Sequence, residues 1–469
     1  MDAALEKRLK RQVIGKTHRF LAIAPLGFEQ TLVREIEGIF SNDRQTTSKS
    51  IEPTERAPLS ERPHVSGDGK VEFTAKITDA WKAVALSRIT NRILMHLTDF
   101  KAENFRELEK KAAEIPWELY LAQKGVHIHV TCKHSRLYHS DAVAERLYKI
   151  IEGVGLPLAP ADTASATPSA GTPRNAPPQN IFVTLIDDRC TLWLDLAGEE
   201  LYRRGHERFV NDAPLKETIA AGMIFEAIEA AASSQSITLI DPMAGSGTFS
   251  LEAAYMANRL IPGICRDFAL KHQPAFKEAT WNYIIKQQES VILSATLSLS
   301  KCKRSASKDL TKIITSDISE RAIEIIRHNV DCSPLAGIAP NENSPTITPQ
   351  IRDLFSYTAK DIADTCGETN PIIVLNPPYG KRLDFDAPKL YTKIGHHLAT
   401  LASGLKQLGK SLTVAILAPK DDTRDGAKYT CTTNLLRECP ALSPENSSTA
   451  KCIATSHGGF SLNVFIAKI

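Results

Sequence analysis

The sequence has no arrangement of cysteines that suggests a disulfide scaffold or a zinc ribbon. Its nine cysteines are scattered singly along 469 residues, and no Cys-x-x-Cys pair occurs. Disulfide scaffolds and zinc ribbons usually carry closely spaced cysteine pairs, so both classes are disfavoured. We therefore expect free thiols in a reducing compartment and no bound metal.

Long apolar runs and an excess of one charge are also lacking. No stretch is long and apolar enough to span a bilayer, and residues 1–16 have no apolar run typical of a signal peptide. Lys and Arg total 57 against 54 Asp and Glu, a formal net charge of +3. We expect a cytoplasmic protein without membrane contact, in which any surface for nucleic acid is a local basic patch.

The first part of the chain has the pattern of an α+β region. Apolar spacing predicts a strand at residues 20–24 and helices at 28–40 and 79–94. Further segments of the same region are a strand at 126–130 and helices at 104–113 and 141–151.

A polar insertion and a hairpin follow. Pro, Ala, Thr and Ser dominate residues 155–180, a composition that cannot build a core, so we interpret this stretch as an insertion loop. Residues 181–186 and 191–195 then form two strand-like runs, which we expect to pair as a hairpin turning at 187–189. Similar polar insertions are expected at 41–61, 300–308 and 340–348.

From about residue 211 onward, apolar strands alternate with helical patterns. This alternation predicts a doubly wound, mostly parallel sheet. The predicted strands are 237–240, 312–315, 348–351, 371–375 and 411–417, with helices at 318–330 and 390–408 and a closing antiparallel hairpin of 451–455 and 462–469. A ligand should bind outside the carboxyl ends of the parallel strands, so the polar residues there are candidates for the site.

A glycine-rich turn, Asp-Pro-Met-Ala-Gly-Ser-Gly-Thr at residues 241–248, follows the first of these strands. Gly245 and Gly247 permit a tight turn and let a ligand approach the backbone at the start of the next helix. NAD, FAD and S-adenosylmethionine sites all use such a turn, so alone it is a weak signal. Residue 250 is Ser where a third glycine is typical of dinucleotide sites, which disfavours NAD.

Two acidic residues end the next two strands. Asp317 can accept both hydrogen bonds from a ribose diol, or it can cap the helix that follows. Asp353 can accept from an adenine amine, or it is simply a solvated strand end. The residue types leave both alternatives open.

The most specific motif is Asn-Pro-Pro-Tyr-Gly at residues 376–380. Two prolines directly after an apolar strand fix the backbone. They hold the Asn376 side-chain oxygen and the Pro377 carbonyl as convergent acceptors for the two N–H groups of an exocyclic base amine. Tyr379 offers a face on which an unstacked base can lie. The alternative is a proline-rich turn without chemistry, which its place beside the glycine turn disfavours.

Taken together, these motifs resemble the S-adenosylmethionine-dependent methyltransferases that act on exocyclic amines. More closely, they are similar in order to the bacterial 23S rRNA guanine-N2 methyltransferases of the RlmL/YpsC type. The matching motifs lie at 201–206, 213–218, 241–248, 261–263 and 376–380. One departure is Ala244, where the family commonly has Cys, and only one of the two methyltransferase domains of some fused members is matched.

The resemblance implies a domain order and partners. It implies a ferredoxin-like segment at 1–64, a THUMP RNA-binding domain at 65–198 and a Rossmann-like class I methyltransferase domain at 199–469, with a seven-stranded, mostly parallel sheet. The implied substrate is guanine N2 in 23S rRNA, and the implied cofactor is S-adenosylmethionine.

The resemblance also implies roles for individual residues. Those expected at the methyl donor are Asp241, Met243, Ala244, Gly245, Ser246, Gly247, Thr248, Asp317, Ile318, Asp353 and Leu354. Asn376, Pro377, Pro378 and Tyr379 are expected at the target base, and Arg203, Arg204 and Arg208 at RNA phosphates.

Three other functions are consistent with parts of the pattern. A THUMP-type tRNA guanine-N2 methyltransferase keeps the chemistry and changes the RNA. A DNA adenine-N6 methyltransferase shares the Asn-Pro-Pro motif but is not expected to carry a THUMP domain. A non-catalytic RNA-binding or ribosome-assembly protein is disfavoured because all the motif residues are intact.

Overall fold

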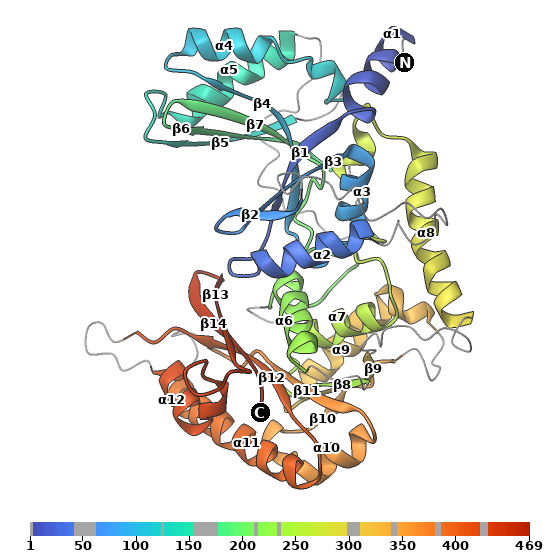
Figure 1. Ribbon diagram of the computed structural model, residues 1–469, viewed down its shortest axis with the longest axis vertical. Coiled ribbons are helices and arrows are strands. Elements are labelled where there is room, and N and C mark those ends of the chain that lie inside the picture. The colour runs from blue at the N-terminus through green and yellow to red at the C-terminus, as the bar shows by residue number, and fades with distance from the viewer. Residues whose placement is uncertain are drawn as a thin grey trace, which may run out of the picture. The chain divides into compact units, whose positions relative to one another are not determined.

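The computed structural model describes residues 3–41, 62–122, 126–153, 177–210, 214–231, 236–297, 310–338, 345–379, 386–422 and 430–469 (Figure 1). The polar insertions expected at 41–61, 155–180, 300–308 and 340–348 lie largely outside these residues. The chain divides into two compact units. Unit 1 comprises Met1–Ile23, Val33–Arg203 and Arg266–Ser294; unit 2 comprises Ala24–Leu32, Arg204–Cys265 and Ala295–Ile469.

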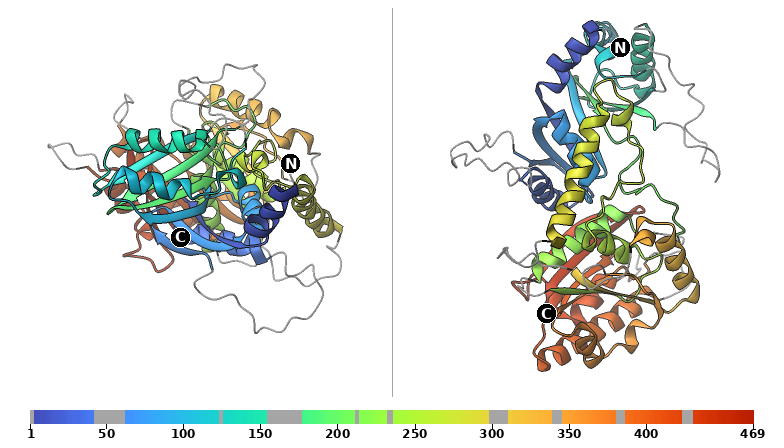
Figure 2. Two further views of the ribbon diagram at one scale, coloured as in Figure 1. Left: turned by 90° about the horizontal axis from the view of Figure 1, so that it is seen from above. Right: turned by 90° about the vertical axis from the view of Figure 1, so that its right-hand side faces the viewer.

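Unit 1 contains a seven-stranded sheet with the order β2-β3-β1-β4-β7-β6-β5. Its strands are β1 (Thr17–Ile23), β2 (His64–Gly67), β3 (Lys70–Lys76), β4 (Arg92–Lys101), β5 (Val126–Lys133), β6 (Gln179–Ile186) and β7 (Arg189–Asp195). Its helices are α1 (Ala3–Leu9), α3 (Ile77–Leu86), α4 (Phe105–Ala113) and α5 (Ser140–Gly153). The boundary between the two units falls within α2 (Glu29–Ser41) and within α8 (Glu278–Leu297), so each of these two helices has residues in both units. The views in Figures 1 and 2 both show α4 and α5 side by side.

The first four strands of this sheet follow the ferredoxin-like order. Along the chain, β1, α2, β2, β3, α3 and β4 give the β-α-β-β-α-β sequence typical of that fold. β1 pairs with both β3 and β4, so strands on either side of residue 64 share one sheet. The domain boundary predicted at residue 64 therefore does not coincide with a break in the sheet.

The helix predicted at 79–94 is wrong in its second half. Helix α3 ends at Leu86, and β4 begins at Arg92. The carboxylate of Glu35 accepts hydrogen bonds from the Ser87 hydroxyl at 2.6 Å and from the Arg88 N–H at 2.8 Å. These bonds stabilise the non-helical backbone after Leu86, and the sequence spacing alone does not reveal a partner so far along the chain.

The hairpin predicted around residue 188 is present. β6 and β7 pair antiparallel, and the two residues between them, Asp187 and Asp188, have φ values of 49° and 61°. Positive φ at both positions is the geometry of the tight turns whose twist matches a β-hairpin. In addition, β5 pairs with β6 in parallel, and α5 connects them.

Unit 2 contains the predicted doubly wound sheet. The strand order is β10-β9-β8-β11-β12-β14-β13; the first five strands are parallel, and β13 and β14 form the expected antiparallel hairpin. The strands are β8 (Ile237–Asp241), β9 (Leu310–Asp317), β10 (Gln350–Ile351), β11 (Asn370–Leu375), β12 (Thr413–Pro419), β13 (Lys451–His457) and β14 (Phe460–Lys468). The helices are α6 (Glu217–Ala230), α7 (Thr248–Ala257), α9 (Glu320–Asp331), α10 (Ala359–Cys366), α11 (Ala387–Gln407) and α12 (Cys431–Glu438).

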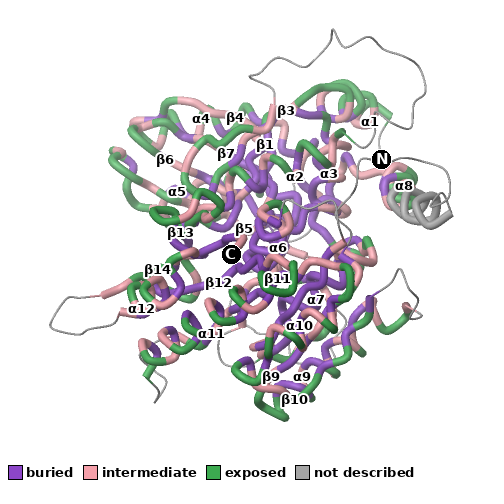
Figure 3. The backbone as a smooth tube through the Cα atoms, turned by 60° about the horizontal axis from the view of Figure 1, so that its bottom comes forward, coloured by how far each residue is buried: buried purple, intermediate pink, exposed green. Residues whose placement is uncertain are grey.

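Helices cover both faces of this sheet. One core cluster joins α10 and α11 to the sheet through residues such as Tyr391, Leu398 and Ile416, all fully buried. Helices α6 and α7 pack on the opposite face, as Figure 1 shows. Figure 3 shows the strands of this sheet mostly as buried backbone, with exposed residues on the outer sides of the helices. This fold is therefore the α/β class I methyltransferase type that the sequence predicted.

Two expectations drawn from absences can be compared with the structure. None of the eight cysteines in the described ranges forms a disulfide bond. A search of the described helices finds none with the length and hydropathy that a membrane crossing requires.

Candidate functional site

The polar residues singled out at the strand ends lie along one edge of the unit 2 sheet. Strands β10, β9, β8 and β11 are consecutive neighbours and parallel, so their carboxyl ends meet at that edge. Asp353, Asp317, Asp241 and Asn376 follow or end these strands in that order. Asp241 pairs with Thr315, and Ile240 with Ile373, so Asp317 and Asn376 both extend beyond the end of β8.

The glycine turn between β8 and α7 is built on positive φ angles. Gly245 has φ 56° and Gly247, the N-terminal cap of α7, has φ 80°. The turn closes through a hydrogen bond of 2.7 Å from the Gly247 N–H to the Ala244 carbonyl. A Cβ at Gly247 would lie 3.1 Å from Ile326, whereas a Cβ at Gly245 would meet nothing within 4 Å. Gly245 thus leaves open space at the start of a helix, where a ligand can approach the backbone.

Asp317 fixes this turn. Its Oδ2 accepts a hydrogen bond of 2.9 Å from the Gly245 N–H, and its Oδ1 accepts one of 2.9 Å from the Ser319 N–H. The helix cap is Ser319, whose hydroxyl accepts from the Ala322 N–H, so the interpretation of Asp317 as the cap of α9 is wrong. Each carboxylate oxygen retains a further lone pair for a ligand diol. Ile318 beside it is 71% exposed.

Asp241 is fully buried beneath the turn. Its Oδ2 accepts hydrogen bonds from the Ser250 N–H at 3.2 Å and from the Ser250 hydroxyl at 2.7 Å. Its Oδ1 has no partner among the described residues. Burial raises the pKa of Asp241 to about 7, although the two bonds from Ser250 oppose this shift. The serine at the position of the missing third glycine therefore has a structural role in holding Asp241.

Asp353 lies at the end of β10 and caps a short turn. Its side chain accepts a hydrogen bond of 3.2 Å from the Phe355 N–H, and the side chain is half-buried. Leu354 next to it is buried, and Met243 from the glycine turn packs against the same core cluster. Asp353 is thus neither a purely solvated strand end nor a fully enclosed acceptor.

The Asn-Pro-Pro-Tyr motif follows β11 directly. The Asn376 Oδ1 is buried and has no hydrogen-bond partner within the described part of the chain. Pro377 is buried and Pro378 exposed, while the Tyr379 ring meets Phe460 edge-on, with centroids 5.8 Å apart. Gly380 lies outside the described residues. A buried acceptor without a partner costs free energy unless a ligand supplies the donor.

The three arginines expected at RNA phosphates differ in their surroundings. Arg203 is exposed, but Arg204 is buried and pairs with Glu252 through two hydrogen bonds of 2.9 and 3.0 Å. A buried, paired guanidinium is not presented to a phosphate, so the expectation that Arg204 contacts an RNA phosphate is wrong. The side chain of Arg208 is 11% exposed and pairs with Glu217.

Arg208 has a role that sequence reasoning missed. Its guanidinium also donates to the hydroxyls of Ser246 and Thr248 in the glycine turn. Buried Asn329 on α9 donates to the Ser246 carbonyl at 3.0 Å and so supports the same turn. These partners are tens of residues apart in the sequence, and no local pattern indicates them.

Comparisons with known proteins agree with this fold. Residues 204–417 match the family model described as an RMKL-like methyltransferase domain. The chain is 28% identical over 365 residues to the ribosomal RNA large subunit methyltransferase K/L of Allochromatium vinosum, covering 73% of this chain and 44% of that protein. The chain thus spans less than half the length of that relative.

Two solved structures share the fold over nearly the whole chain. A possible methylase from Clostridium difficile 630 has a TM-score of 0.65 and 21% identity, over 96% of this chain and 98% of that one. SMU.472, described as a methyltransferase and complexed with SAH, also has a TM-score of 0.65 and 21% identity, over 96% of this chain and 98% of that one.

Proposed function

We propose, from the match of residues 204–417 to the RMKL-like methyltransferase domain, that the protein methylates the exocyclic N2 amine of a guanine in large-subunit ribosomal RNA. The methyl donor in this proposal is S-adenosylmethionine. The K/L relatives are named for ribosomal RNA of the large subunit, and SMU.472 was solved with SAH. The observation that carries the proposal is the buried Asn376 Oδ1, which has no hydrogen-bond partner among the described residues and lies on the sheet edge that also carries the glycine turn.

The residues at the sheet edge fit the donor. Gly245 leaves open space above the turn, and the carboxylate of Asp317 faces the same turn through its bond to the Gly245 N–H. We assign the ribose hydroxyls to Asp317 and the adenine amine to Asp353, with the exposed Ile318 beside the donor. Bound there, S-adenosylmethionine supplies a methyl group on a sulfonium, which is transferred without metal or covalent nucleophile.

Asn376 and its neighbours act on the base. In the proposed mechanism, the Asn376 Oδ1 and the Pro377 carbonyl accept hydrogen bonds from the two N–H groups of the amine. These two hydrogen bonds orient the amine nitrogen toward the methyl donor. A positive charge develops on that nitrogen as the N–C bond forms and the S–C bond breaks, and the two oxygens stabilise it. The extra proton then leaves to water. Tyr379 supports the base, which must be taken out of its stack to reach the site.

Unit 1 supplies the proposed RNA-binding surface. His96, Trp193, Phe182 and His129 lie directly opposite one another on β4, β7, β6 and β5, so they share one face of the sheet. The His129 and Phe182 rings stack at 4.7 Å, and the Arg19 guanidinium lies 5.4 Å from the Trp193 ring. Trp193 itself is buried and packs with Leu21 and Leu94, so the rings offered to unpaired bases are the partly exposed Phe182 and the exposed His129. RNA affinity should fall as salt rises.

Two experiments test the proposal. Calorimetry in the presence of a chelator should show binding of S-adenosylmethionine and of SAH; binding of NADH in their place would overturn the cofactor assignment. Mass-spectrometric mapping of modified guanines in a deletion strain should show one N2-methylguanine missing from large-subunit rRNA. Loss from tRNA instead would replace the substrate by the tRNA alternative, and loss of a methyladenine from DNA would refute an RNA substrate.

A further inference from the structure

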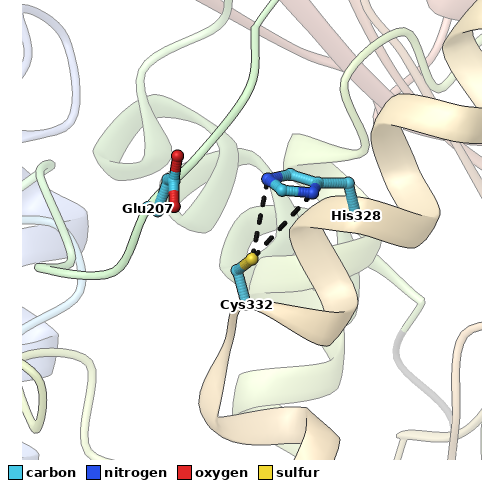
Figure 4. Close-up of side chains that lie close together, drawn as sticks. All are labelled: Glu207, His328 and Cys332. Atoms are coloured by element: carbon cyan, nitrogen blue, oxygen red, sulfur yellow. Dashed lines mark hydrogen bonds between the residues drawn. The ribbon is translucent and has the colours of Figure 1, made fainter. Parts of the chain in front are cut away.

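A cluster of three potential metal ligands lies in unit 2, outside the residues assigned to methyl transfer. Glu207 precedes α6. His328 lies in the last turn of α9, and Cys332, four residues on, is the C-terminal cap of that helix, so the two project from the same side. One ligand atom from each residue lies within 4.8 Å of the other two. Figure 4 shows the three side chains directed toward one another.

The distance between the imidazole and thiol ligand atoms is close to that around a tetrahedral ion. The His328 Nε2 and the Cys332 Sγ are 3.5 Å apart, and Nδ1 of the same ring is 4.0 Å from that Sγ, so a rotation of the Cys332 side chain is needed for both residues to bind one ion through Nε2. Zinc bonds of about 2.0–2.1 Å to nitrogen and about 2.3 Å to sulfur, at a tetrahedral angle, put these atoms about 3.5 Å apart. Glu207 is exposed, so its side chain can rotate to bring the carboxylate up to the ion without disturbing the core.

The two chain segments that carry the cluster are held together independently of any ion. The Phe209 ring stacks on the His328 ring, with centroids 3.8 Å apart and an interplanar angle of 15°. The Phe209 N–H donates to the Asn329 side chain at 2.7 Å, and that side chain donates back to the Phe209 carbonyl at 2.9 Å. These contacts fix the imidazole plane and hold residue 207 near α9. A ligand set that is already positioned loses little entropy when an ion binds.

We propose that Glu207, His328 and Cys332 bind a divalent transition-metal ion of the zinc class, with a water molecule as the fourth ligand. Thiolate and imidazole ligands favour zinc or cobalt over magnesium or calcium, which prefer oxygen ligands. The ion links the segment before α6 to α9. That segment contains Arg208, and α9 contains Asn329, the two residues that support the glycine turn. The proposal differs from the sequence-based expectation of no bound metal, and the role proposed for the ion is structural.

Cobalt titration of the full-length, reduced protein tests the proposal. Cobalt takes the place of zinc in tetrahedral sites, and a thiolate–cobalt bond gives a charge-transfer absorption band that other ligands do not give. The wild-type protein should bind a single cobalt ion with this band, and zinc should displace it. Zinc should also raise the thermal midpoint of the wild-type protein.

Variants identify the ligands. Cys332→Ser should abolish the charge-transfer band, whereas Cys265→Ser, at an exposed cysteine outside the cluster, should keep it. His328→Gln should keep the thiol and weaken cobalt binding by at least about 10- to 100-fold, since changes even in outer-shell partners cost that much. Thermal unfolding without metal shows that each variant is folded. The absence of a band in the wild type, or a band that persists in Cys332→Ser, would overturn the proposal.

Discussion

Strand β3 of unit 1 and strands β8 and β12 of unit 2 are buried in different ways. In unit 1, β3 alternates: Val71, Phe73 and Ala75 are buried, and the residues between them are partly exposed. In unit 2, every residue of β8 and of β12 is buried. An antiparallel sheet can leave one face to solvent, whereas a parallel sheet with helices on both faces cannot.

This difference determines where polar chemistry can be located. In unit 2, β8 and β12 are apolar apart from Thr238, Thr413 and the terminal Asp241. The acidic and amide side chains gather at the strand ends, where Asp241, Asp317, Asp353 and Asn376 lie. In unit 1, aromatic and polar side chains occupy a sheet face, as the row from His96 to His129 shows. A site for one small reacting group needs only the ends of a few strands, whereas a site for an extended polymer needs a broad surface such as a sheet face.

The largest effect should come from core substitutions that compare the two burial patterns. Phe73→Ala in β3 should cost about 3–5 kcal/mol of unfolding free energy, and the neighbouring Thr74→Ala about 1 kcal/mol or less. In β12, Ile416→Ala and Leu417→Ala, at adjacent positions, should each cost about 2–5 kcal/mol, because both faces are covered. Native-state hydrogen exchange measures each unit separately. Alternating effects along β12 would contradict the comparison.

Asn376→Ala should have the next largest effect, and it should act on the reaction alone. Loss of one preorganised polar group is expected to raise the barrier to methyl transfer by about 2.7–4 kcal/mol. Affinity for S-adenosylmethionine should be nearly unchanged, because the side chain contacts the target amine. Turnover on RNA and calorimetry with the donor measure the two quantities.

Two further substitutions sharpen this test. Asn376→Asp keeps an acceptor oxygen and should keep partial activity. Asn446→Ala, at an exposed asparagine in the same unit, should have normal activity. Normal turnover by Asn376→Ala would refute the proposed mechanism and leave the motif as a structural turn.

Asp317→Ala should weaken binding of the donor and leave binding of RNA unchanged. The variant loses a charged acceptor, whose hydrogen bonds are worth about 1.5–3 kcal/mol, and the Gly245 N–H loses its partner. Asp317→Asn retains one oxygen acceptor and should lose less affinity. Asp364→Ala on α10 is an exposed control. Calorimetry that shows equal donor affinity for Asp317→Ala and Asp364→Ala would remove Asp317 from the site.

The smallest effect concerns pH. Burial raises the pKa of Asp241 from its ordinary value of 3.8 to about 7, so the folded protein retains a proton that the unfolded chain has lost. The associated stability is fully present below about pH 4 and is lost as the pH rises to about 7, with a slope of at most about 1.4 kcal/mol per pH unit. Asp241→Asn should flatten this slope, and the exposed Asp364→Asn should not. Denaturant unfolding of the donor-free protein at several pH values measures it.

Local pattern was sufficient for most of the fold of unit 2 and for placing the candidate site residues along one edge of its sheet. The strands of unit 2 and its helices α9 and α11 lie within a few residues of where apolar periodicity predicted them, and the polar strand ends were recognised because the ends of parallel strands share an edge. The helix expected at 79–94 was wrong because Glu35, far away in sequence, ends it at Leu86. The assignment of Arg204 was wrong because its partner Glu252 is 48 residues distant.

The sequence by itself determined the alternation of strands and helices in unit 2, the mostly parallel character of its sheet, and the residue types at the strand ends, because these depend on short-range periodicity and turn chemistry. Tertiary structure alone decided which residues became partners. It brought Asp317 to the Gly245 N–H, Arg208 to Ser246, and Glu207 to His328 and Cys332. Such contacts follow from packing and strand pairing between segments separated by tens to more than a hundred residues, and a local pattern carries no information about them.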